Sequence, residues 1–179
     1  MVERQDFPRL WKKIEIDDSV RNRLIKHAED ILKSDKYHKT CDFIQHGDVS
    51  VYEHCLMVAA CALHINDTFK FNCNERALVR GALLHDYFLY DWHDHDCIDN
   101  IHPKLHGFYH PGIALKNASR DFNLSPIEKD IIKKHMWPLT VIPPSCREAW
   151  VVTMADKYSS LLETVKIRKG HGKTKPKYA

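Results

Sequence analysis

The sequence predicts an all-α protein. Apolar residues recur with the spacing of a helix face in several stretches of the 179-residue chain, and two of these stretches begin with a capping box. No stretch shows a convincing alternation of apolar and polar residues, which is the pattern of a half-buried strand. A chain of this length with 44% hydrophobic residues can bury a core of its own, so we expect one domain.

The first two predicted helices span residues 17–33 and 50–66. In the first, apolar residues follow one another at intervals of three or four positions. The second begins with Ser50 and Glu53, which form an S-x-x-E capping box ahead of an apolar stripe. Both patterns predict helices that bury one face.

The third predicted helix follows Asn74, a residue suited to cap it, and spans residues 75–90. This segment is apolar on most sides, which predicts a central place in the fold. Residues 91–109 are rich in Asp and His and show no clear period. His110 and Pro111 then open a helix to about residue 120, with proline at its first position.

Two further helices complete the prediction. Ser125 and Glu128 form a second capping box in front of a short amphipathic helix. Prolines at positions 138, 143 and 144 predict a break after it. The last long helix is predicted for residues 146–167.

Composition and charge argue against several classes of protein. The apolar runs are shorter than the ~20 residues of a membrane span, and the N-terminus MVERQDFPRLWKK does not resemble a signal peptide. The net charge of +3 comes from six basic residues after Glu163, without which the rest of the chain carries −3. A nucleic-acid-binding surface is therefore not predicted, and we interpret the basic tail as a solvated terminus. We expect a soluble, cytoplasmic protein without a membrane partner.

Histidine is unusually frequent, with 13 residues, and several lie with aspartate on predicted inward faces. His85 and Asp86 fall inside the most apolar predicted helix, where an aspartate loses hydration unless it is paired or bound to a metal. A lone His-Asp pair occurs often by chance, but other predicted helices also carry inward-facing ligands. Such an arrangement holds one or two divalent ions in helical bundles. The additional residues are His54, His110, His135 and Asp156.

The order of these residues, H…HD…H…H…D, resembles the HD-domain superfamily of metal-dependent phosphohydrolases. The segments GALLHDY and VVTMADK are similar to the family's sequences around the His-Asp pair and the last aspartate. The resemblance covers about residues 42–165 and implies an HD-type helical bundle, with residues 1–179 as a single HD domain and 166–179 as a basic tail. Within the superfamily the chain looks like small bacterial HD hydrolases without a defined substrate. No Gly-Tyr-Pro motif follows the pair, which argues against an enzyme for cyclic-di-GMP.

The resemblance implies a role for each of these residues. His54, His85, Asp86 and Asp156 would hold a first metal ion, and His110 and His135 would hold a second ion that Asp86 bridges to the first. Asp86 and His85 are the expected catalytic residues. Nitrogen and oxygen ligands suit one or two ions of Fe, Mn, Ni, Co or Zn. Hydroxide bound to the metal would then attack phosphorus.

The expected substrate is a small phosphorylated molecule, nucleotide-like, and it needs cations or hydrogen-bond donors beside the metals. Four residues near the predicted ligands are weak candidates for this contact: His46, Lys104, His106 and Lys157. The DWHDHD run at 91–96 could bind metal by itself, but adjacent acids repel each other and we expect a solvated loop.

Two alternatives stay open at this point. Some di-iron proteins of the same fold are oxygenases with the same ligand set, and oxygen consumption by an iron-loaded sample would distinguish them. A non-catalytic sensor that binds a metal or a nucleotide is the other alternative, although all six ligand positions are filled. The sequence leaves the metal, the substrate and the oligomeric state open.

Overall fold

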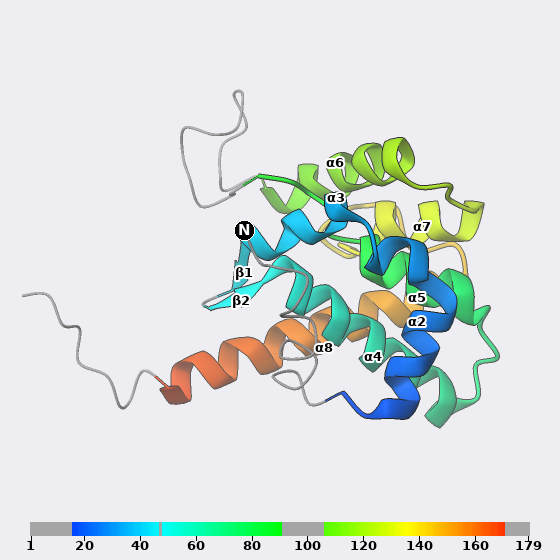
Figure 1. Cartoon of the computed structure of the whole chain (residues 1–179), viewed down its shortest axis with the longest axis horizontal. Helices are drawn as coiled ribbons and strands as arrows, with labels where there is room; N and C mark the ends of the chain where they lie inside the picture. Colours follow the sequence, from blue (N-terminus) through cyan, green and yellow to red (C-terminus); the bar gives the residue numbers. More distant parts are fainter. Residues whose placement is uncertain (1–15, 47, 91–105, 171–179) are drawn as a thin grey trace, which may run out of the picture.

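The computed structural model describes residues 16–46, 48–90 and 106–170, and helices dominate these ranges. Figure 1 shows α6 and α8 on opposite sides of the molecule, with α5 between them. The α-helices are α2 (Asp18–Leu32), α3 (Asp35–His38), α4 (Val51–Phe69), α5 (Glu75–Leu84), α6 (His106–Asp121), α7 (Pro126–Lys134) and α8 (Arg147–Gly170). The all-α prediction is confirmed.

The core forms around α4, which packs against α5 and α8. Helix α5 is almost entirely buried, since every residue from Ala77 to Leu84 is shielded from solvent. Helix α7 packs on α5 and α8, and α6 packs on α7. The central place predicted for the third helix therefore holds. No helix in the described ranges combines the length and apolar character needed to cross a membrane.

Both predicted capping boxes are confirmed. The Ser50 side chain accepts a hydrogen bond from the Glu53 amide, and Glu53 accepts one from the Ser50 amide at 3.0 Å. The same exchange joins Ser125 and Glu128 at the start of α7. These reciprocal bonds satisfy amides that a helix start otherwise leaves without partners, so they fix where α4 and α7 begin.

The two largest differences from the predicted helix boundaries are at the end of α5 and the start of α6. Helix α5 stops at Leu84, so His85 is its C-cap and the His-Asp pair lies just beyond the helix rather than inside it. Helix α6 begins at His106, and Pro111 lies inside it rather than at its first position. A proline one turn into a helix removes one backbone hydrogen bond, which the rest of α6 tolerates.

A small amount of structure was not predicted. After α3 the chain forms the 3-10 helix η2 (Lys39–Asp42) and the antiparallel strands β1 (Ile44–His46) and β2 (Val49–Ser50). These strands are too short to show an alternating pattern, which explains why the sequence did not reveal them. They lead directly into α4 and place Gln45 beside the site described below.

Helices α5 and α7 approach each other closely at Gly81. A Cβ atom added there would meet Ile131 atoms at 2.4, 2.9 and 3.0 Å. We expect Gly81→Ala to lower the free energy of unfolding by ~1–3 kcal/mol through overpacking, although alanine favours a helix by ~1 kcal/mol over glycine. Urea denaturation followed by circular dichroism measures this change. Gly112→Ala is the matched control, because nothing lies within 4 Å of its added Cβ and it should be neutral or stabilising.

Candidate metal centre

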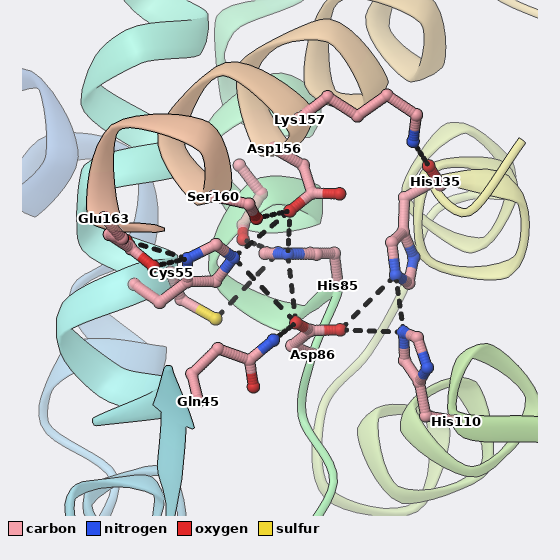
Figure 2. Close-up of polar contacts among 12 residues, drawn as sticks. Gln45, Cys55, His85, Asp86, His110, His135, Asp156, Lys157, Ser160 and Glu163 are labelled. Carbon is pink, nitrogen blue, oxygen red and sulfur yellow. Dashed lines mark hydrogen bonds and ion pairs between the residues drawn. The ribbon is translucent and has the colours of Figure 1, made fainter. Parts of the chain in front are cut away.

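Six buried side chains from five helices or their ends meet around Asp86. Helix α4 supplies one histidine, the end of α5 supplies the His-Asp pair, and α6, α7 and α8 supply one residue each. None of the six is more than 7% exposed. Figure 2 shows most of this cluster, with Asp86 between ligand groups. The six residues are His54, His85, Asp86, His110, His135 and Asp156.

The first group lies on the Oδ2 side of Asp86. This oxygen is 3.4 Å from His85 Nε2 and 3.9 Å from His54 Nε2. Asp156 Oδ1 closes the group from α8, at 3.2 Å from His54 Nε2 and 3.7 Å from His85 Nε2. Two imidazole nitrogens and two carboxylate oxygens thus converge on one small volume.

The second group lies on the Oδ1 side of the same carboxylate. Asp86 Oδ1 is 3.1 Å from His110 Nε2 and 3.3 Å from His135 Nε2, and these two nitrogens are 2.8 Å apart. Figure 2 shows the two rings turned toward this oxygen. Asp86 therefore faces a separate pair of histidines with each of its oxygens.

Hydrogen bonds at Nδ1 explain why Nε2 of His85 and His135 points into the centre. Nδ1 of His85 lies 2.7 Å from the Ala82 carbonyl oxygen, and Nδ1 of His135 lies 2.9 Å from that of Ile132. A carbonyl only accepts, so in the neutral ring Nδ1 carries the proton and Nε2 is left with a lone pair for an ion. Histidines that ligate metals are held in the same way.

Two atoms of the centre lack hydrogen bonds. His85 Nε2 and Asp86 Oδ1 are both buried, and neither has a hydrogen-bond partner in the described part of the chain, although charged groups lie near them. Buried polar atoms normally have partners. An ion on each side of Asp86 would satisfy both atoms, and nitrogen and oxygen donors suit divalent transition metals. The residues present therefore fit a metal centre.

The charges of the centre depend on one another. Burial alone would lower the pKa of His54, but hydrogen bonds to Asp156 and Glu163 outweigh it and raise this pKa to about 10. Burial likewise opposes ionisation of Asp86, yet the charges of His85 and His110 hold the pKa of this carboxyl well below its usual range. The raised pKa of His54 favours a proton on this imidazole, and an ion that binds His54 must displace that proton.

Of the four residues predicted to contact the substrate, the structure describes the side chain of one, Lys157. Lys157 is exposed on α8, and its ammonium group donates to the carbonyl oxygen of His135 at 3.2 Å, beside the centre. His46 lies in β1 and His106 begins α6, but their side chains lie outside what the structure describes. Lys104 and the 91–96 run fall outside the described residues.

The sequence analysis missed several buried residues that contact the centre, among them Gln45, Glu163 and Cys55, whose Sγ lies 3.8 Å from His85 Nδ1. Gln45 Nε2 donates to Asp86 Oδ2 at 2.7 Å, and no pattern in the sequence points to it. Glu163 contacts His54 Nδ1 through both carboxylate oxygens, at 3.0 and 3.2 Å. A signal existed for Glu163, because it follows Asp156 by seven residues and so shares its helix face.

A family model described as HD domain matches residues 51–161, more than half of the chain. The chain therefore belongs to the HD domain family, a superfamily of metal-dependent phosphohydrolases. The matched range contains all six residues of the centre, but Gln45 and Glu163 lie outside it. No curated protein and no solved structure matches the chain.

Proposed function

We propose that this protein hydrolyses a small phosphate ester, a nucleotide-like phosphomonoester or phosphodiester, with two divalent metal ions. The observation that carries the proposal is the position of Asp86. One of its oxygens faces His54 and His85, and the other faces His110 and His135. Such a carboxylate can bridge two ions, and pairs of ions ~3.5–4 Å apart are the usual centre for phosphoryl chemistry.

Each residue has a place in this proposal. His54, His85, Asp86 and Asp156 hold the first ion, and Asp86, His110 and His135 hold the second. Bound ions would lower the pKa of a coordinated water and offset negative charge on the phosphoryl oxygens. Gln45 donates to Asp86 and holds its carboxylate between the two histidine groups.

Lys157 is the proposed contact for an outer phosphate oxygen. Lys157 is an exposed residue whose ammonium group donates to the His135 carbonyl oxygen, and an ammonium group has three donors in all. The weaker candidates His46, Lys104 and His106 keep the same role in the proposal. An ammonium group is a flexible point charge, which suits binding of phosphate esters of different shapes.

A screen with defined ions tests the reaction. Metal-free protein is loaded separately with Mn, Fe, Co, Ni or Zn and given p-nitrophenyl phosphate, its bis ester and nucleoside 5′-monophosphates. We expect phosphate release that requires the added ion and stops with EDTA. Oxygen consumption by the iron-loaded protein without hydrolysis would favour the oxygenase alternative. Bound metal with neither reaction would favour a sensor.

In the proposed centre, His110 and His135 hold only the second ion, and the first ion does not need them. We expect His110→Ala and His135→Ala each to reduce bound metal from about two ions per chain toward one. Hydrolysis should fall by orders of magnitude, because the clamp on attacking and leaving oxygens is lost. Plasma mass spectrometry on purified, metal-loaded protein counts the ions.

His64→Ala is the control for these two variants, because His64 is an exposed histidine of α4 away from the centre. If His135 has only a structural role, its alanine variant should lose ~1–3 kcal/mol of stability with an unchanged metal count. Unchanged stoichiometry in both the His110 and His135 variants would reduce the centre to one ion.

A further inference from the structure

The histidines of the centre differ in the group that contacts Nδ1, the ring nitrogen that points away from Asp86. His85 and His135 each use a backbone carbonyl three residues earlier in the chain. His54 instead contacts the carboxylate of Glu163, at 3.0 and 3.2 Å from its Nδ1. Both side chains are buried, with exposed fractions of 0% and 3%. This contact joins the start of α4 to the second half of α8.

The position of each histidine in its helix explains the difference. His85 and His135 are C-caps, and the carbonyls of a last helical turn have no amide partner within the helix. His54 lies in the first turns of α4, where backbone carbonyls accept amides four residues later. The neighbouring carbonyls of α4 are engaged in this way, and Nδ1 of His54 instead contacts a side chain from another helix, Glu163.

We propose that Glu163 is a positioning residue that sets the affinity of the first metal position. Its carboxylate accepts the Nδ1–H hydrogen bond of His54 and keeps Nε2 turned toward Asp156 and Asp86. A carboxylate partner also makes a histidine a stronger ligand than a carbonyl partner does. The proposal rests on the proposed function, because it assumes that ions bind at this centre.

One face of α8 then contributes two residues to the first metal position. Asp156 supplies a ligand, and Glu163, two turns later, supplies the support for a second ligand. In the proposed ligand sets the first position has four protein ligands, His54, His85, Asp86 and Asp156, whereas the second position shares Asp86 and adds only His110 and His135. The two ions should therefore bind with unequal affinity, the first more tightly.

Titration with Zn²⁺ alone against a chromophoric chelator tests this inference. Glu163→Gln keeps an acceptor oxygen but loses the charge, and we expect it to weaken the tighter ion by about 10-fold. Glu163→Ala removes the acceptor, and we expect up to about 100-fold, the range for partners of metal ligands. In both variants the weaker ion should change much less. With Co²⁺ in place of Zn²⁺, the visible spectrum should change for the first ion only.

Glu148→Gln is the matched control. Glu148 is a buried glutamate of the same helix, about two turns from Asp156 on the side opposite to Glu163, and it accepts a hydrogen bond from the Asn74 amide at 2.8 Å instead of contacting a histidine of the centre. Its variant should bind both ions as the unchanged protein does. A merely structural role of Glu163 would lower the melting temperature without changing the ratio of the two affinities.

The outcomes separate this inference from the proposed function. If the unchanged protein binds no ion, the proposed function fails, and this inference with it. If it binds two ions and Glu163→Gln and Glu163→Ala bind them equally well, only the inference fails. If the alanine variant does not fold, the isosteric glutamine variant decides alone, and unchanged affinity in it overturns the inference.

Discussion

Asp86→Asn should abolish hydrolysis and leave the protein without a bound pair of ions. Asparagine keeps the shape of the side chain and its bond from Gln45 can be rearranged, but it removes the charge that both histidine groups face. An amide also cannot bridge two ions with two anionic oxygens. We expect activity at background, metal content well below one ion per chain, and a circular dichroism spectrum that still reports helices.

Asp67→Asn is the control for this prediction. Asp67 is a surface aspartate that pairs with Arg23, and its side chain is 50% exposed. The same chemical change there should leave metal content and activity as they are. Asp86→Ala gives a second variant with no polar group at the position. Full activity in folded, metal-supplied Asp86→Asn or Asp86→Ala protein would remove Asp86 from the reaction.

Arg80→Met should produce the largest loss of stability. Arg80 is 1% exposed, and its guanidinium group donates to Glu128 Oε1 at 3.1 Å and to the Asn123 carbonyl oxygen at 3.3 Å. It also pairs with Asp30, so one side chain links α5 to α2 and to the start of α7. Removing one partner of a buried pair leaves the other charge uncompensated, which costs about 3–5 kcal/mol. Reversible urea unfolding measures the loss.

A matched arginine and a second substitution sharpen this test. Arg76 is one turn earlier on α5 but exposed, and Arg76→Met should cost less than about 1 kcal/mol. Adding Glu128→Gln to Arg80→Met removes the uncompensated charge while glutamine still serves the capping box. We expect the double variant to recover part of the lost stability. Equal losses for Arg76→Met and Arg80→Met would show that the buried network contributes little.

Helix starts could be predicted from the sequence better than helix ends. Ser50 and Ser125 fix the starts of α4 and α7 through local hydrogen bonds that depend on residues three positions apart. The end of α5 has no such local signal, because Tyr87 and Phe88 are buried and Leu89 and Tyr90 half-buried although none of the four is helical. Tertiary burial, rather than periodicity, accounts for the apolar run FLY that extended the prediction to residue 90.

The sequence predicted that the six residues would lie together, and the structure brings them together, but the sequence did not predict the residues that contact them from a distance along the chain. His54, Asp86 and Asp156 belong to a recognisable order of residues, whereas Gln45 contacts Asp86 across 41 positions and Glu163 contacts His54 across 109 positions of sequence. Such contacts depend on how α4, α8 and β1 are placed in space. The roles of the individual residues in metal binding and catalysis remain predictions for the experiments above.

The C-terminal ends of α5 and α7 affect the order in which ligands bind at the centre. Both helices finish beside Asp86, with His85 and His135 as C-caps, and a helix C-terminus carries about half a negative charge. This field belongs to the backbone, so no side-chain substitution removes it. It attracts cations and repels phosphate. Under the proposed function we therefore expect compulsory-order binding, in which the ions enter first and reverse the local potential, the phosphate ester enters second, and the product anion leaves while the ions stay.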